Sequence, residues 1–151
     1  MADQIEPRAS IEETCQWIKL ADLPAHCLPA VAELYASQGW GEEKAFDLQA
    51  MERAFRACFG VCALDNGRVL GFARGFSDGW QAGWLAEIVV HRDCIGLGLG
   101  TALARAFMLR CGAEVVYCEA LAGREPFFER LGFKVRPRLS AMAWRAPTGC
   151  G

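Results

Sequence analysis

Apolar residues recur along the chain with two different periods, and together these predict a mixed α/β fold. Apolar spacings of three and four residues predict helices over about 23–37, capped by Asp22, and over about 47–56. Unbroken or alternating apolar runs predict strands, at about 15–19, 61–64, 69–76, 84–90, 115–118, 133–135 and 141–144. The run 84–90 is apolar on both faces, which favours a central position in the sheet.

Turn residues separate these elements. Asp65-Asn66-Gly67 between two apolar runs predicts a β-hairpin, because Asn and Gly both tolerate a positive φ. A glycine-rich turn after Val90 leads into a third helix that ends near Arg110. A short fourth helix begins at Glu125-Pro126 and ends at Leu131-Gly132. The order of elements predicts a single crossover near the middle of the chain rather than a regular βαβα alternation.

Length and composition favour one folded domain. The chain has 151 residues, of which 53% are hydrophobic, and this is enough for a sizeable core. Residues 1–13 are polar and acidic, so we expect a flexible leader there and a single domain over 14–151. The sequence has no secretory signal pattern and no uncharged apolar run of the roughly 18 residues that a membrane helix needs, so no membrane partner is expected.

Charge and cysteine usage exclude further classes. A formal net charge of −2 gives no basic patch for nucleic acid. The eight cysteines are scattered without a CxxC pair, which indicates free thiols in a reducing cytoplasm. Because there are only two histidines and no zinc-ligand spacing, no metal site is expected.

The turn after Val90 carries three glycines at alternate positions, Gly96, Gly98 and Gly100. Glycine permits a positive φ and a close approach to the main chain, and the first turn of the following helix has unpaired N–H groups at its positive end. The turn therefore predicts an anion site, most often for phosphate. It is neither a P-loop, since no lysine precedes Thr101, nor a G-x-G-x-x-G dinucleotide fingerprint. The alternative is a turn that serves only helix packing.

Two stretches of the sequence resemble the GNAT N-acetyltransferases. Residues 90–103 are similar to that family's acetyl-CoA motif, V-x-P-x-x-Q/R-x-x-G-x-G/A-x-x-L, and residues 127–133 are similar to its F-Y-x-x-x-G-F signature. The order of elements agrees over about 14–145, and the resemblance implies the GNAT acyltransferase fold, a central mixed sheet with about four flanking helices. Leu34-Tyr35 with Gly39-Trp40, residues 71–74 with 77–79, and residues 142–144 are similar to small bacterial members and to plant serotonin or lysine acetyltransferases.

The resemblance implies a site for acetyl-CoA as cosubstrate. In the family, the motif strand bulges and separates from the next strand, and this leaves a slot for pantetheine. The implied lining is the main chain of Ile88, Val89 and Val90. The pyrophosphate would be held by Ile95, Gly96, Leu97, Gly98, Leu99, Gly100 and Thr101. Phe127 and Phe128 would pack beside the thiol end, a role compatible with plain core packing.

The chain departs from the family pattern at three positions. Ile95 stands in place of Gln or Arg, so a side-chain contact is lost while the main-chain N–H is expected to remain. Arg92 replaces the usual Pro. Phe128 replaces the Tyr that often protonates the departing thiolate, and Phe has no proton to give. Cys94, beside the turn, is a further candidate for a lowered thiol pKa.

Glu87 is the candidate general base, because it is a carboxylate within an otherwise apolar strand. The alternative is an ion pair with Arg74 on the neighbouring strand. Four aromatic side chains are candidates for the acceptor pocket, with ordinary core packing as the alternative: Tyr35, Trp40, Phe76 and Trp84.

These observations predict a cytoplasmic acetyl-CoA-dependent N-acetyltransferase. The acceptor would be a primary amine, either a small aryl or alkyl amine or a peptide or lysine amine. Two alternatives remain: an acetyl-CoA-binding sensor or interaction module without turnover, and a nucleotide-binding protein of another fold. The family often forms dimers through its last strands, and residues 142–144 would suit a homodimer.

Overall fold

The computed structural model describes residues 10–147. The chain forms two compact units, one ending at Cys118 and the other beginning at Glu119. Most of the predicted leader lies outside the described residues, and its last residues begin a short helix, α1 (Ile11–Thr14).

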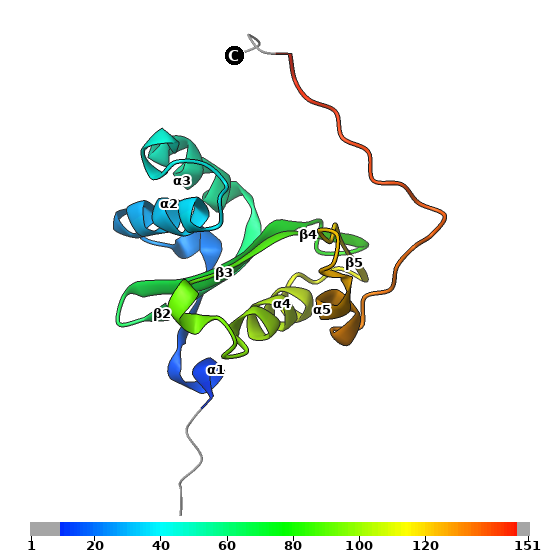
Figure 1. The fold of residues 1–151 in the computed structure, drawn as a ribbon, viewed down its shortest axis with the longest axis horizontal. Helices are drawn as coiled ribbons and strands as arrows, with labels where there is room; N and C mark the ends of the chain where they lie inside the picture. Colours follow the sequence, from blue (N-terminus) through cyan, green and yellow to red (C-terminus); the bar gives the residue numbers. More distant parts are fainter. Residues whose placement is uncertain (1–9, 148–151) are drawn as a thin grey trace, which may run out of the picture. The chain divides into compact units, whose positions relative to one another are not determined.

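The first unit contains a five-stranded sheet in the order β1-β2-β3-β4-β5 (Figure 1). The strands are β1 (Gln16–Lys19), β2 (Phe59–Asp65), β3 (Arg68–Ser77), β4 (Ala82–Val90) and β5 (Val115–Cys118). Neighbouring strands are antiparallel except β4 and β5, which are parallel and joined by the crossover helix α4 (Leu99–Arg110). The five strands predicted before residue 119 are therefore confirmed, as is the single crossover.

The predicted central position of the run 84–90 is only partly right. β4 has a neighbour on each side, but the middle strand is β3. Trp84 keeps 39% of its surface exposed, so the apolar character of this run does not reflect complete burial.

Helix α2 (Leu28–Ser37) begins later than the predicted residue 23. Two short 3-10 turns, Leu20–Asp22 and Ala25–Cys27, precede it, and Asp22 makes no capping hydrogen bond. Pro29 explains the late start, because a residue without an N–H fits only in the first turn of a helix.

Helix α3 (Leu48–Ala57) matches the predicted range of about 47–56, and Asp47 is its N-cap. The Asp47 side chain accepts hydrogen bonds from the Gln49 and Ala50 N–H groups at 3.0 and 3.1 Å. These bonds satisfy two of the donors that the first turn leaves unpaired.

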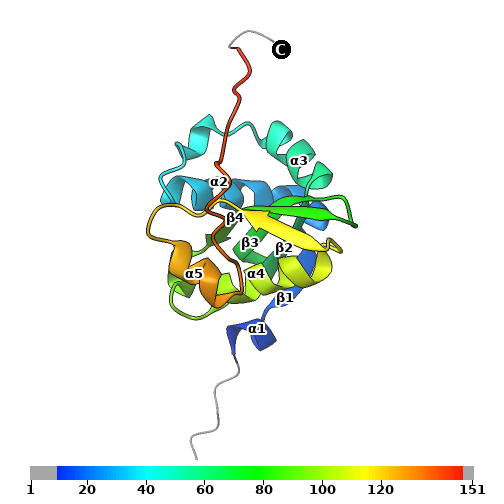
Figure 2. The same cartoon turned by 90° about the vertical axis from the view of Figure 1, so that its right-hand side faces the viewer.

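The sheet carries helices on both faces, α2 and α3 on one and α4 on the other (Figures 1 and 2). On the first face Phe72 of β3 contacts the rings of Tyr35 and Phe55 at 5.6 and 5.5 Å. On the second face Phe59 of β2 contacts Phe107 of α4 at 4.9 Å. A Cβ on Gly71 would meet Val89 O at 2.6 Å and Leu103 at 3.1 Å, so glycine permits the close approach of strand and helix there.

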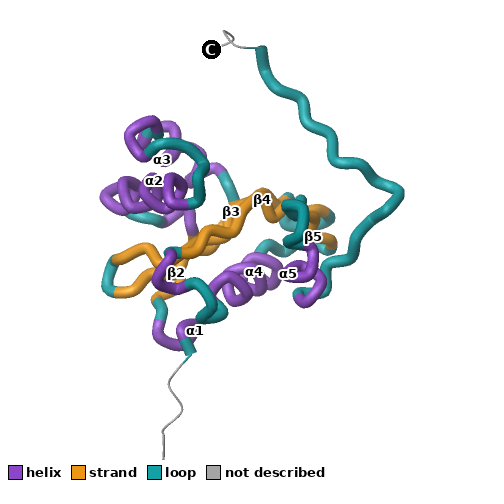
Figure 3. The backbone as a smooth tube through the Cα atoms, in the orientation of Figure 1, coloured by secondary structure: helices purple, strands orange, loops and turns teal. Residues whose placement is uncertain are grey.

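In the second unit, residues 119–147 form one helix, α5 (Glu125–Arg130), as predicted. The predicted strands at 133–135 and 141–144 are wrong for the described residues, which form no strand after Cys118 (Figure 3). A strand needs a neighbouring strand to take up its N–H and C=O groups, and this segment has none within its own unit.

Candidate active site

The β4 strand carries an irregularity at the centre of the site. Arg74 of β3 lies opposite Glu87, whereas the next residue, Gly75, lies opposite Leu85. Ala86 is therefore the extra residue of a β-bulge. A bulge shifts the alternation of side chains along the strand, and it leaves Glu87 as the first regularly paired residue on the far side.

The bulge coincides with the end of the β4–β5 pairing. β5 pairs with Ala82 to Leu85 and with nothing further along β4. From Ala86 to Val90, the side of β4 that would face β5 therefore has no strand partner within the described residues. This stretch of β4 is therefore an open sheet edge on the side of β5, whereas on its other side it pairs with β3.

The hydrogen-bond alternation identifies which backbone groups face this edge. The His91 N–H donates to Leu70 O at 2.7 Å, so the groups of His91 face β3. In an antiparallel pair this orientation repeats every second residue. Val89 therefore faces β3, whereas the N–H and C=O groups of Ile88 and Val90 face the open edge.

This geometry revises the predicted lining. Val89 was expected to contribute main-chain groups, but its backbone belongs to the β3 ladder and its side chain is fully buried. Sequence reasoning could not separate the three residues, because the alternation depends on the register with β3.

The glycine turn has a left-handed backbone at two positions. Gly96 has φ 80° and Gly98 has φ 85°, and a Cβ at either position would meet open space. Gly98 is the N-cap of α4, so the turn leads directly into the positive end of a 12-residue helix. The buried Leu99 side chain anchors the helix start in the core.

Several amides of this turn are free. Among the described residues no hydrogen-bond partner is found for the N–H groups of Gly96, Gly98, Leu99, Gly100 and Thr101. The N–H groups of Ile95 and Leu97 are used, since they donate to Arg92 O and Cys94 O at 3.3 Å each. The Ile95 N–H that was expected to remain is present, and it closes the 3-10 turn at Arg92–Cys94.

The side chains of the turn add no charge to this cluster of amides. Ile95 and Leu97 project apolar side chains that are 67% and 58% exposed. An anion bound here would therefore be held by backbone N–H groups and by the helix dipole.

Cys94 does not have the lowered thiol pKa that its position suggested. The residue is buried, and burial raises the pKa of its thiol, although Arg68 opposes this shift. Desolvation of the charged form thus outweighs the charge of Arg68, and Cys94 is a protonated thiol at neutral pH.

Glu87 lies in a cluster of side chains from three elements. Arg74 Nε donates to Glu87 Oε1 at 2.6 Å, and the Tyr35 hydroxyl donates to the same oxygen. The side chains of Glu87 and Arg74 are 14% and 22% exposed. The ion pair with Arg74 is thus present, and Oε2 has no hydrogen-bond partner among the described residues.

The protonation states of the two partners follow from this contact. Burial and the negative charge of Glu87 raise the pKa of Tyr35, so its hydroxyl stays protonated. Burial works against the charge of Arg74, but the hydrogen bond and the charge of Glu87 raise the Arg74 pKa overall. The cluster therefore joins a neutral phenol, a guanidinium and a carboxylate.

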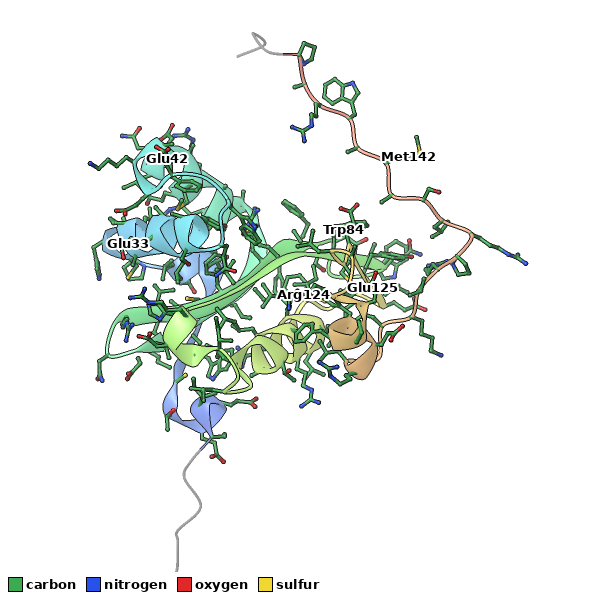
Figure 4. All side chains as sticks on the ribbon, in the orientation of Figure 1. Glu33, Glu42, Trp84, Arg124, Glu125 and Met142 are labelled. Atoms are coloured by element: carbon green, nitrogen blue, oxygen red, sulfur yellow. The ribbon has the colours of Figure 1, made fainter. Side chains whose placement is uncertain are left out.

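The predicted acceptor aromatics form two pairs, and one of these pairs includes Tyr35 of this cluster. Tyr35 contacts Trp40 at 5.8 Å, and Phe76 lies directly opposite Trp84 across β3 and β4. Figure 4 shows Trp84 at the end of β4 that pairs with β5. Trp40, Phe76 and Trp84 are 44%, 54% and 39% exposed, so the core alternative holds only for the buried Tyr35.

In the second unit, Phe127 and Phe128 lie in α5 with their rings 5.1 Å apart, and Phe128 contacts Phe133 at 5.7 Å. This cluster holds α5 against the chain that follows it. A role for either side chain beside the thiol end of a cosubstrate stays a prediction.

Residues 17–133 match the model of the acetyltransferase (GNAT) family. The chain belongs to this family. Its five-stranded mixed sheet with flanking helices is the GNAT acyltransferase fold, and membership makes the chain an N-acetyltransferase. The GNAT family generally uses acetyl-CoA.

Solved structures of GNAT proteins have the same fold. A protein of Deinococcus radiodurans R1 assigned as an acetyltransferase is 27% identical, with a TM-score of 0.67 and coverage of 93% of each chain. A GNAT-family protein of Streptococcus pneumoniae TIGR4 is 19% identical, with a TM-score of 0.70 and coverage of 88% of this chain and 98% of that one. A ribosomal-protein-alanine N-acetyltransferase of Brucella melitensis is 21% identical, with a TM-score of 0.59 and coverage of 87% and 98%. No match was found among curated proteins.

Within residues 10–147, none of the helices is long and apolar enough to span a membrane. The same residues contain no group of three or more His, Cys, Asp or Glu side chains placed to hold a metal ion.

Proposed function

We propose that this chain transfers an acetyl group from acetyl-CoA directly to a primary amine. The observation that carries the proposal is the open β4 edge leading into a turn of unpaired amides, with a carboxylate where the edge begins. The fit of these groups to the cosubstrate is chemical: backbone donors suit a diphosphate, and a strand edge suits the amide groups of pantetheine.

In this proposal the free amides from Gly96 to Thr101 bind the pyrophosphate. Ile88 and Val90 pair with the pantetheine arm through their outward backbone groups. The N–H near Val90 meets the developing oxyanion, because a fixed donor stabilises charge that appears only in the transition state. Phe127 and Phe128 pack beside the thiol end.

The reaction is a single displacement without an acyl-enzyme. The amine nitrogen forms a bond to the thioester carbonyl carbon, and the carbon–sulfur bond breaks to release the CoA thiolate. The amine loses one proton, which Glu87 takes directly or through water. Because Phe128 cannot protonate the thiolate, that proton comes from solvent.

The acceptor amine contacts the exposed aromatic side chains beside Glu87. Trp40, Phe76 and Trp84 offer apolar area for the body of a small aryl or alkyl amine, or for a peptide that carries the amine. Tyr35 supports this surface from beneath through its ring contact with Trp40.

Two wider properties belong to the same proposal. We propose that the protein acts in the cytoplasm, where its cysteines stay reduced. We also propose a homodimer formed through the segment near 142–144, in which Met142 and Trp144 are 91% and 82% exposed.

Ligand binding and turnover test the proposal together. Thermal shift with CoA, ATP and NAD should show stabilisation by CoA alone. Acetylation of a panel of amines is then followed by mass spectrometry, since the free cysteines would consume a thiol reagent. Binding without turnover on any amine would favour the sensor alternative, which Phe128 keeps open, and stabilisation by ATP or NAD instead of CoA would refute the proposal.

A further inference from the structure

We propose that Arg74 and Tyr35 are positioning residues that hold Glu87 through its Oε1 atom and leave Oε2 as the oxygen that accepts the proton of the amine. This inference rests on the proposed function. It adds two residues, from different elements, to the carboxylate that the sequence singled out.

Both donors converge on one oxygen of Glu87. Arg74 Nε lies 2.6 Å from Oε1, and the Tyr35 hydroxyl donates to that same atom. A carboxylate has two oxygens and about four acceptor positions. Holding it by one oxygen fixes its orientation and leaves the other oxygen available for a proton.

The two donors are themselves fixed by packing. Tyr35 is 8% exposed, and its ring lies 5.5 Å from Phe46 and 5.6 Å from Phe72. Arg74 lies opposite Glu87 in the strand register, at the last pair before the bulge. The cluster therefore holds Glu87 where the open edge of β4 begins, next to the backbone groups proposed to bind the thioester.

The positive charge of Arg74 affects Glu87 in addition to the hydrogen bond. The titratable groups that face Glu87 are Tyr35 of α2, Arg74 of β3 and Cys58 after α3. Burial raises the pKa of both Tyr35 and Cys58, so neither carries charge at neutral pH. Arg74 is thus the one cation in contact with Glu87 among the described residues, and removing a cation from beside a carboxylate favours its protonated form.

The test is the pH profile of kcat for the full-length protein with saturating acetyl-CoA. Arg74→Met should move the acidic limb to higher pH and lower kcat roughly 10- to 100-fold. Tyr35→Phe should lower kcat by a smaller factor. Neither variant should change the KM for acetyl-CoA, which the proposed site binds elsewhere.

Two further variants separate positioning from simple damage to the fold. Arg74→Lys retains the cation and should restore the position of the acidic limb. Arg56→Met removes an arginine that pairs with Glu52 at 2.6 Å on the exposed side of α3, and it should leave the profile unchanged.

The outcomes distinguish this inference from the proposed function. If the wild-type protein acetylates amines but Arg74→Met and Tyr35→Phe keep its pH profile and kcat, the positioning role of Arg74 and Tyr35 is refuted and the proposed function stands. If the wild-type protein binds no CoA and acetylates no amine, the proposed function fails and the positioning role fails with it. If Arg74→Met does not fold, its pH profile is replaced by ¹³C NMR titration of the Glu87 carboxyl in the wild-type protein and in Arg74→Lys. The Glu87→Gln variant assigns the resonance. A Glu87 carboxyl found protonated in the wild-type protein at the pH of maximal activity would refute the positioning role.

Discussion

The amide turn and the carboxylate cluster lie at opposite ends of the open β4 edge and are built in different ways. The turn from Gly96 to Thr101 offers backbone N–H groups and carries no charged side chain. The cluster around Glu87 is made of three side chains from three elements, all part-buried. A backbone site tolerates changes of side chain as long as the φ angles survive, whereas a side-chain site fails when one partner is removed.

The largest expected effect falls on the carboxylate. Glu87→Gln keeps the shape of the side chain and removes its ability to take a proton, so kcat should fall on the order of 100-fold or more. The KM for acetyl-CoA should stay the same. An active Glu87→Gln protein with an unchanged pH profile would remove Glu87 from the mechanism.

The next effect falls on the turn, through its backbone. Gly98→Ala places a Cβ on a residue with φ 85°, which strains the N-cap of α4 and should weaken CoA binding about tenfold. Calorimetric titration with CoA measures this loss.

Gly67→Ala is the matched control for Gly98→Ala. Gly67 has φ 80° and equally open surroundings, but it lies in the β2–β3 hairpin. It should lower the free energy of unfolding similarly without affecting CoA affinity. Equal losses of affinity in the two variants would mean that the turn acts only through stability.

Substitution of an exposed aromatic side chain should change the KM for the amine without affecting the amide turn or the Glu87 cluster. Trp84→Ala removes apolar contact area next to Glu87, so the KM for the amine should rise about fivefold while CoA affinity is unchanged. Trp80→Ala, at a tryptophan that is 71% exposed in the β3–β4 connection, serves as the control. A similar rise in KM for both variants would argue against a specific acceptor contact at Trp84.

The smallest expected effect comes from adding a charged side chain, which the glycine turn lacks. Ile95→Arg adds a cation beside the free amides on a side chain that is already exposed, so CoA should bind about threefold more tightly at low salt. The gain should disappear at high ionic strength, because salt screens an exposed charge. A gain that salt does not reduce would point to packing rather than charge.

Much of the fold followed from local patterns. The Asn66-Gly67 hairpin, the helix near 47–56, the end of α4 at Arg110 and the short helix after Arg124 depend on neighbouring residues, and each was predicted correctly. The errors had two different causes. The late start of α2 reflects Pro29, a local signal that the predicted start at residue 23 did not take into account. The missing strands after Gly132 reflect the absence of a partner strand among the described residues of their unit.

By itself the sequence determined the glycine turn, the position of Glu87 in an apolar strand and the two family motifs, because these are properties of adjacent residues. Only the tertiary structure decided that Ala86 forms a bulge, that Ile88 and Val90 rather than Val89 face the open edge, and that Tyr35 shares an oxygen of Glu87 with Arg74. These features depend on the register between strands and on the packing of a helix that lies 52 residues away from Glu87 in the sequence. Local pattern did not reveal the bulge between β3 and β4, because the pairing of these strands and the contacts between layers form only when distant segments meet.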